Sequence, residues 1–230
     1  MHLVDQILLG VLLILAPVNG VAQLALARKN QELARIPVYV SSGIFIFVLG
    51  AASAIVGVMA AGPASLGLAP IDPLMFVAWS VAVAAAVLGI MMLFTWIARA
   101  AGLRDSPFLA RLFPRTRRER ACFAGLSFVA GTGEEIAYRG YAMSTLGMMS
   151  VGPWMAAAVT SVAFGLLHSY QGVRGIVTTG VAGFAFAASF ILTRSIWPAM
   201  AAHIMIDLVA GLVLGEKLLT HGDGGTDACA

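Results

Sequence analysis

The stretch from Pro73 to Ala98, PLMFVAWSVAVAAAVLGIMMLFTWIA, contains no charged residue and decides the fold class. A helix that crosses the ~30 Å hydrocarbon core of a bilayer needs roughly 20 apolar residues at a rise of 1.5 Å each, and this stretch is long enough. The whole chain agrees with it. Of its 230 residues, 60% are hydrophobic and only 11% are charged, which leaves too little polar surface to cover a soluble globule. The sequence therefore predicts an integral membrane protein.

Six more apolar runs make the protein polytopic. No charged residue lies between Asp5 and Arg28 or between Arg35 and Asp72. Four further runs are bounded by Gly, Pro, Arg or a polar cluster, and they cover residues 121–146, 152–170, 175–193 and 196–215. We therefore expect an all-α bundle of about seven transmembrane helices that forms one domain over residues 1–219. Residues 220–230 are small and polar, which is typical of a disordered cytosolic tail.

The basic residues predict the topology. All but two of the 14 Lys and Arg residues fall after the first, third, fifth and seventh runs, and these segments lie on one side of the membrane. By the positive-inside rule that side is cytoplasmic, so the N-terminus faces out and the C-terminus faces in. No Lys or Arg precedes the first run, so we expect a permanent helix there instead of a cleavable signal peptide. The Arg-rich stretch 99–120 is then a loop on anionic lipid, and we expect no nucleic-acid partner.

Six ionisable side chains fall inside the predicted helices. Such a group at membrane depth costs at least ~2.5 kcal/mol on insertion scales, so each one needs a reason. They are Glu134, Glu135 and Arg139 on the fourth helix, His168 on the fifth, and His203 and Asp207 on the seventh. Acid, base and imidazole groups from three separate helices indicate one shared polar cavity.

Spacing along the helices separates the roles of these groups. Successive helical residues turn by about 100°, so Glu135 and Arg139, four apart, lie about 40° apart and are able to form a structural ion pair. Glu134 lies about 140° from Arg139 and points to another face, where it has no cation nearby in the sequence. His203 and Asp207 repeat the four-residue spacing, so the carboxylate lies one turn from the imidazole. One carboxylate is thus neutralised and the other is left available.

Three motifs carry a resemblance to a known family. Glu134–Arg139 (EEIAYR) matches E-E-x-x-x-R, Phe164–His168 (FGLLH) matches F-x-x-x-H, and His203–Asp207 (HIMID) matches H-x-x-x-N/D, in that order. Over a core of residues 121–215 the chain resembles the CPBP family, the CAAX-protease and bacteriocin-processing group that includes type II CAAX prenyl endopeptidases. The first three helices resemble that family only in being hydrophobic.

The resemblance implies a glutamate-type intramembrane protease. By analogy, Glu134 is the general base that takes a proton from a water held between it and His168, and this water attacks the scissile carbonyl. His203 and Asp207 then hold the developing oxyanion. The better-known CAAX enzymes have Asn where this chain has Asp207, and Asp donates a hydrogen bond only when protonated. The alternative for Asp207 is to accept a hydrogen bond from His203 and set its tautomer.

The resemblance also implies the substrate class and the compartment. We expect a membrane-anchored peptide or protein, delivered by the lipid bilayer and processed at a CAAX-type C-terminus or at a leader or anchor segment. We expect the protein in a bacterial inner membrane, with its C-terminus in the cytoplasm.

A zinc site is the alternative to a cofactor-free mechanism, because two Glu and two His are common zinc ligands. Its ligands would be Glu134, His168 and His203. The H-E-x-x-H pattern is absent, however, and no two His lie four apart on one predicted helix, so the spacing does not demand a metal. A water activated by a carboxylate suffices, and we expect no required cofactor.

Two other classes of function remain open at this point. Buried carboxylates and histidines also mark proton-coupled transporters. Carriers, however, commonly have pseudo-symmetric halves, whereas all six ionisable groups here follow residue 130. The third class is a membrane scaffold or immunity protein that has kept the fold without turnover, and the intact motifs argue against it.

Overall fold

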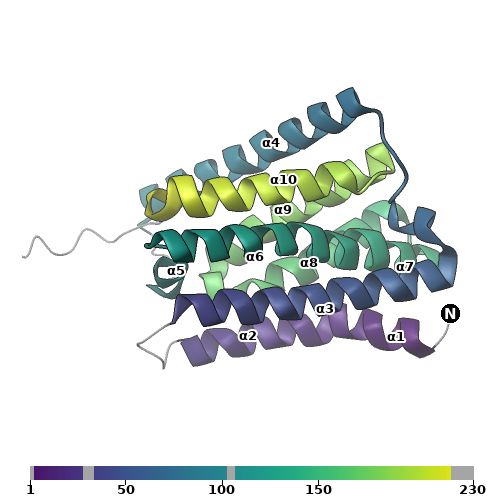
Figure 1. Cartoon of the computed structure of the whole chain (residues 1–230), viewed down its shortest axis with the longest axis horizontal. Coiled ribbons are helices and arrows are strands. Elements are labelled where there is room, and N and C mark those ends of the chain that lie inside the picture. Colours follow the sequence, from purple (N-terminus) through teal and green to yellow (C-terminus); the bar gives the residue numbers. More distant parts are fainter. Residues whose placement is uncertain (1–2, 28–33, 103–106, 219–230) are drawn as a thin grey trace, which may run out of the picture.

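The protein is a bundle of helices (Figure 1). The computed structural model describes residues 3–27, 34–102 and 107–218, and within these ranges it contains helices and no strand. This confirms the all-α polytopic bundle. The tail predicted over residues 220–230 lies outside the described residues.

Seven helical rods follow one another along the described part of the chain. They are α1 (Leu3–Gly10) continued by η1 (Val11–Leu15) and α2 (Ala16–Ala27); α3 (Arg35–Ala61); α4 (Pro73–Ala100); α6 (Arg117–Glu135) continued by η3 (Ile136–Ala142) and α7 (Met143–Met148); α8 (Pro153–Leu167); α9 (Gly172–Thr193); and α10 (Trp197–Leu208) continued by η5 (Val209–Leu214). Shorter elements connect them, namely η2 (Pro63–Leu66), α5 (Pro107–Leu112), η4 (Ser169–Gln171) and η6 (Gly215–Leu218).

Five of these rods are long and apolar enough to cross a membrane by length and composition, and they are the rods that contain α1, α3, α4, α9 and α10. The other two carry most of the predicted site. The rod from α6 to α7 holds the charged residues of the first motif, and α8 has only 15 residues. The two rods that do not meet the length and composition of a membrane span are therefore the ones that carry Glu134, Glu135 and Arg139 and that end at His168.

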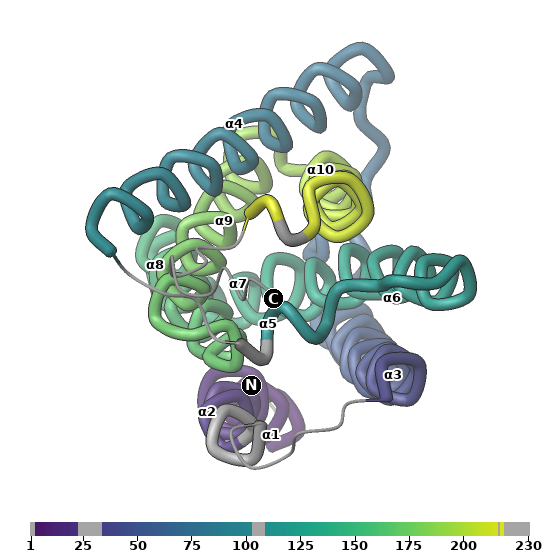
Figure 2. Tube along the Cα trace, turned by 90° about the vertical axis from the view of Figure 1, so that its left-hand side faces the viewer, coloured from purple at the N-terminus to yellow at the C-terminus, as the bar shows by residue number. Residues whose placement is uncertain are grey.

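Seen end-on, α10 lies between α4 and α6, and α8 pairs with α9 in a hairpin (Figure 2). The α3 helix runs along α6 in the same direction. A Cβ atom added at Gly50 of α3 would lie 2.7 Å from the Cα of Gly133 in α6, so these backbones approach more closely than any larger residue allows. This contact fixes the segment of α6 that leads directly into Glu134.

The start of α6 is set by a capping box. The Thr116 hydroxyl accepts from the backbone N–H of Glu119, and the Glu119 carboxylate accepts from the backbone N–H groups of Arg115 and Thr116 at 2.8 and 2.9 Å. Those backbone donors, first that of Arg115, lower the pKa of Glu119 from its ordinary value. Glu119 also pairs with Arg35 at 3.3 Å, which ties α6 to the beginning of α3.

The short α8 helix explains how the second motif reaches the interior of the bundle. At 1.5 Å per residue, a 15-residue helix is about 22 Å long, which is less than the ~30 Å hydrocarbon core. His168 caps its C-terminus and therefore lies inside the bundle, where α2 covers the turn. Gly20 of α2 permits this, because a Cβ there would overlap the carbonyl oxygen of Leu167. We predicted a longer helix over residues 152–170, and the structure ends it at Leu167.

Three of the rods contain π-helical turns, at η1, η3 and η5. A π turn changes the register of a helix and leaves carbonyl groups for other donors. Tyr138 in η3 donates its hydroxyl to the carbonyl oxygen of Leu12 in η1 at 3.2 Å, and Arg120 donates to that of Leu212 in η5 at 2.6 Å. Both contacts anchor rods on either side of the ionisable residues.

Candidate active site

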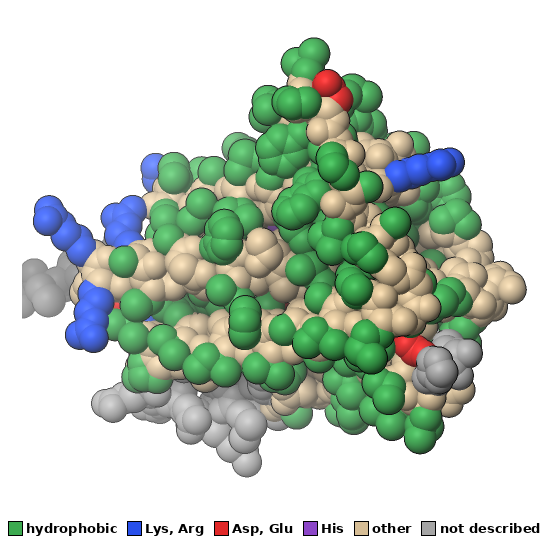
Figure 3. Space-filling view, turned by 45° about the vertical axis from the view of Figure 1, so that its right-hand side comes forward, with side chains coloured by type: hydrophobic (Ala, Val, Ile, Leu, Met, Phe, Trp, Pro, Cys, Tyr) green, Lys and Arg blue, Asp and Glu red, His purple; other side chains and the backbone are tan. Residues whose placement is uncertain are grey.

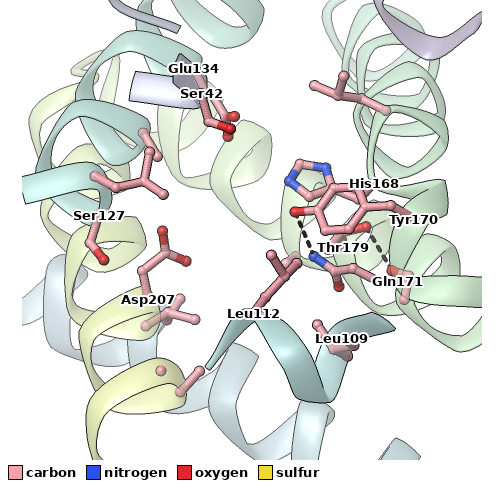
Figure 4. A pocket seen from close by; sticks show the side chains of 18 of the residues that line it. Ser42, Leu109, Leu112, Ser127, Glu134, His168, Tyr170, Gln171, Thr179 and Asp207 are labelled. Atoms are coloured by element: carbon pink, nitrogen blue, oxygen red, sulfur yellow. Dashed lines mark hydrogen bonds between the residues drawn. The ribbon is translucent and has the colours of Figure 1, made fainter. Parts of the chain in front are cut away.

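A cavity of about 530 Å³ opens inside the bundle and brings the predicted site residues together. Glu134, His168, His203 and Asp207 all line it, so four side chains from two helices and one helix cap share one space. Figure 4 shows Glu134, His168 and Asp207 around this space. Most of the remaining wall is apolar and comes from α3, α4, α6, α9 and α10. Leu109 and Leu112 of α5 also line it, so this part of the Arg-rich loop covers the cavity.

Behind the cavity wall lies a fully buried ion pair. The Arg139 Nη1 atom is 2.9 Å from the Glu135 Oε1 atom, and neither side chain is exposed. The guanidinium also packs on aromatic rings, with its carbon 4.6 Å from the centre of the Phe164 ring and 5.4 Å from that of Phe186. Arg139 therefore binds Glu135 and packs against these rings, behind the cavity wall.

Glu134 points to the cavity instead. Its carboxylate oxygen Oε2 lies 3.9 Å from His203 Nε2, and its side chain is 10% exposed. This imidazole nitrogen thus lies beyond hydrogen-bond distance of Glu134. Of the two neighbouring carboxylates, Glu134 is the one that a water molecule in the cavity can approach.

His203 is oriented by Glu135. Its Nδ1 atom lies 2.8 Å from Glu135 Oε1, the same oxygen that binds Arg139. A carboxylate beside an arginine accepts, so Nδ1 carries the hydrogen and Nε2 is turned to the other two acids. Nε2 lies 3.9 Å from both Glu134 and Asp207. Asp207 was the alternative that we predicted to set this tautomer, whereas the short contact to the imidazole in the structure belongs to Glu135.

His168 is oriented by its own helix. Its Nδ1 atom lies 2.8 Å from the carbonyl oxygen of Phe164, and because a carbonyl only accepts, Nδ1 carries the hydrogen. Nε2 is then the acceptor of the ring. Figure 4 shows His168 across the cavity from Glu134, with open space between them. A water molecule in that space would meet one carboxylate and one imidazole acceptor.

The cavity contains polar groups that the motifs did not indicate. Ser42 of α3 lies on the same side as Glu134 (Figure 4), although none of the three motifs falls in the first three helices. Tyr170 and Gln171 of η4 line the cavity beside His168, and Thr178 and Thr179 face it from α9. A lone Ser or Thr in an apolar helix gives no sequence signal, whereas Tyr170 follows the second motif by two residues.

A buried acid outside the cavity also escaped prediction. Asp5 was treated as the boundary of the first run, yet it is only 2% exposed. The Tyr141 hydroxyl lies 3.2 Å from its backbone oxygen and 3.4 Å from its carboxylate. This contact joins α1 to η3 at the end of the bundle away from the cavity.

The donor groups do not form a metal site. Within residues 3–27, 34–102 and 107–218, no group of three or more His, Cys, Asp or Glu is arranged to hold a metal ion. Of the alternative zinc ligands Glu134, His168 and His203, both histidines hold Nδ1 against protein acceptors and leave Nε2 for the cavity.

Comparison with known families matches this part of the chain. Residues 117–209 match the family model described as type II CAAX prenyl endopeptidase Rce1-like. Residues 117–209 form an Rce1-like domain. Comparisons with curated proteins and with solved structures found no match.

The Rce1-like domain begins with α6 and ends at the first residue of η5. It contains all six ionisable residues of the three motifs, and the resemblance to the CPBP family is confirmed. The description of the matched family model indicates a protease. The helices before it, α1 to α5, supply the cover of the cavity and two of its walls.

Proposed function

We propose that this protein hydrolyses peptide bonds of a membrane-anchored substrate with a water molecule activated by Glu134. One observation carries the proposal. Glu135 forms an ion pair with the buried Arg139, whereas Glu134 faces the cavity opposite His168. A carboxylate that already neutralises an arginine is a poor base, whereas Glu134 has no arginine or lysine beside it among the described residues and is suited to accept a proton.

In the proposed reaction, the water lies between Glu134 and His168 Nε2. Glu134 accepts one proton as the water oxygen forms a bond to the scissile carbonyl carbon. The carbonyl oxygen becomes an oxyanion. When the carbon–nitrogen bond breaks, the proton held by Glu134 passes to the leaving amine. The products are a carboxylic acid and an amine, which exchange one proton to become a carboxylate and an ammonium group, and Glu134 returns to its starting state.

His203 is the proposed donor to the oxyanion. With Nδ1 held by Glu135, the second nitrogen Nε2 is turned to the cavity, where it is able to donate when protonated. Asp207 lies 3.9 Å from that nitrogen, one helical turn along α10. Glu135 and Arg139 act as positioning residues behind this histidine.

We propose a substrate with a lipid or helical anchor, cleaved at a CAAX-type C-terminus or next to a leader or anchor segment. The cavity has mostly apolar walls, which suits a substrate delivered from the bilayer. Lys and Arg side chains gather at one end of the molecule (Figure 3), the end where α6 begins. By the positive-inside rule we assign this end, and the C-terminus, to the cytoplasm of a bacterial inner membrane.

The test is cleavage by the full chain in liposomes. The probes are a farnesylated peptide with a CAAX C-terminus and an acylated peptide, each with a fluorophore and a quencher on either side of the scissile bond. We expect Glu134→Gln to abolish cleavage. Glu119→Gln, at the capping box and outside the cavity, serves as the matched control and should cleave like the wild type.

A strong zinc chelator is added in parallel. We expect no effect, because the water is activated by a carboxylate. Loss of activity with the chelator would replace the proposed mechanism by a metal-dependent one. Full activity of Glu134→Gln, or a folded wild type that cleaves neither probe, would contradict the proposed function.

A further inference from the structure

The cavity has an opening on the side of the bundle, between α2 and α3. Of the described residues that line the cavity, the exposed ones are Asn19 of α2 and Ser41 and Phe45 of α3. The other lining residues are buried or half-buried, including Leu109 and Leu112 of the covering helix α5. The outer surface of the bundle and the cavity therefore meet where α2 and α3 face each other.

The two helices beside this opening pack against other parts of the bundle. The α2 helix packs mainly against α8, and α3 packs mainly against α6. Gly20 of α2 lies against the Leu167 carbonyl oxygen, and Gly50 of α3 lies against Gly133. Figure 2 shows α2 and α3 apart from each other on the same side of the molecule. These packing contacts leave the space between α2 and α3 open.

The opening lies at the depth of the hydrocarbon core. Ser41 and Phe45 are six and ten residues beyond Arg35, where α3 begins, which is about 9 and 15 Å at 1.5 Å per residue. Asn19 is eight residues, or about 12 Å, before Ala27, where α2 ends. The hydrocarbon core is ~30 Å thick, so the opening faces lipid chains in the cytoplasmic half of the bilayer.

Two polar side chains at the opening have no hydrogen-bond partner among the described residues. They are Asn19, which is exposed, and Ser42, which is half-buried. Other hydroxyls of these helices bond back to a carbonyl oxygen of their own helix, as Ser53 does to Leu49 at 2.8 Å. An amide without partners in hydrocarbon is strongly destabilising. We therefore expect Asn19 and Ser42 to bind a polar ligand that comes through the opening.

The opening leads directly to the proposed base. Figure 4 shows Ser42 on the same side of the cavity as Glu134. Phe45 and Ile46 also share a smaller pocket with Glu134 and with Leu167, at the end of α8. A chain that enters between α2 and α3 therefore arrives at Glu134, past apolar side chains that suit a lipid and polar side chains that suit a peptide.

We propose that this opening is the entry site for the substrate, and that Asn19 and Ser42 bind the backbone of an extended peptide segment beside its membrane anchor. The inference rests on the proposed function and states how that substrate is bound. An extended segment brings backbone N–H and C=O groups without partners into the membrane, and an amide both donates to and accepts from such groups. A helical segment or an acyl chain offers no such groups. Phe45 and Ile46 contact the apolar anchor.

The first experiment measures cleavage of the farnesylated CAAX peptide in liposomes. Asn19→Leu combined with Ser42→Ala should raise KM about tenfold or more and change kcat less than about twofold, because the lost hydrogen bonds are made when the substrate binds. Ser53→Ala is the matched control on α3, since Ser53 does not line the cavity and its hydroxyl binds its own helix. It should leave both constants unchanged. A wild-type KM for the double variant, or a loss confined to kcat, would overturn the inference.

The second experiment needs no turnover. In the full chain with Glu134→Gln, which holds the peptide uncleaved, p-benzoylphenylalanine replaces Phe45 or Phe47, and light links it to a bound farnesylated peptide. Phe47 is the matched control, because it is 64% exposed on the same helix and does not line the cavity. Position 45 should give a crosslink that excess unlabelled peptide removes, and position 47 should give none. Equal crosslinking at both positions, or none at position 45, contradicts an entry site here.

The two experiments separate this inference from the proposed function. A crosslink at position 45 that unlabelled peptide removes, with no cleavage of either probe by the wild type, supports the entry site and contradicts the proposed hydrolysis. Cleavage by the wild type without a crosslink at position 45 refutes the entry site and leaves the role of Glu134 standing.

Discussion

The buried pair of Glu135 and Arg139 should behave as a unit in a double-mutant cycle. We consider Glu135→Leu, Arg139→Leu and the double variant. Both side chains are fully buried and 2.9 Å apart. Removal of one partner leaves the other charge buried without it, whereas removal of both leaves only apolar side chains in the same space. The double variant should therefore be more stable than the two single losses predict.

The contacts set the size of each effect. Breaking a buried pair costs about 3–5 kcal/mol of unfolding free energy. Arg139→Leu should fall at the lower end of that range, because Glu135 keeps the His203 Nδ1 atom at 2.8 Å. Glu135→Leu should fall at the upper end, because Arg139 and His203 both lose the oxygen that they share. The double variant should cost at least about 3 kcal/mol less than the sum of the single variants.

The assay is denaturant unfolding in detergent micelles, followed by circular dichroism, with peptide cleavage measured on the same samples. The comparison cycle uses Arg35 and Glu119, which pair at 3.3 Å at the start of α6 and are partly exposed. Its coupling should be smaller, because water and salt screen it. Additive losses in the Glu135 and Arg139 cycle would refute the reasoning. The double variant should also cleave slowly, since His203 has lost its orienting carboxylate.

Two further predictions concern the framework of the site. Gly20→Ala should lower cleavage at least about tenfold with little loss of helical signal, because the new methyl group displaces the end of α8 and misplaces His168. The control in the same rod is Gly10→Ala, whose new methyl group would meet no atom within 4 Å. Equal activity of the two variants would contradict the explanation. The pKa of Glu119 is lowered by backbone N–H donors, so its carboxylate stabilises the fold above the ordinary value of 4.5, and this contribution is lost as the pH falls through the lowered value. Melting temperatures of the wild type and Glu119→Gln should therefore differ at pH 7 and converge in acid, and a constant difference would count against the role of the capping box.

The sequence predicted the helical fold well because a bilayer imposes a simple rule. Charge-free runs of roughly 20 residues become helices, and the runs between Asp5 and Arg28 and from Pro73 correspond closely to the observed rods. The rod that contains α8 departs from the rule. A short helix is stable there because α2 and α9 pack around it, and these tertiary contacts leave no local pattern in the sequence.

The sequence predicted the contacts of the site only between residues that lie three or four positions apart on one helix. That spacing indicated the pairing of Glu135 with Arg139 and the separation of Glu134 from it. It could not indicate the contact between Glu135 and His203, because 68 residues separate the two side chains. Tyr170 was equally hidden, since its place in the cavity follows from the turn η4 and from no helical periodicity.

The cavity is closed toward the end of the bundle where α1 begins. Its lining, within the described residues, includes no residue from η2, α7 or the connection between α9 and α10. The residues that line the cavity, among those described, therefore give water no route to Glu134 from the end of the bundle where α1 begins. A transmembrane voltage is worth about 2.3 kcal/mol per unit charge per 100 mV, and it falls mainly across the sealed part of the protein. The bundle is thus able to keep hydrolytic water inside an energised membrane without becoming a leak for ions.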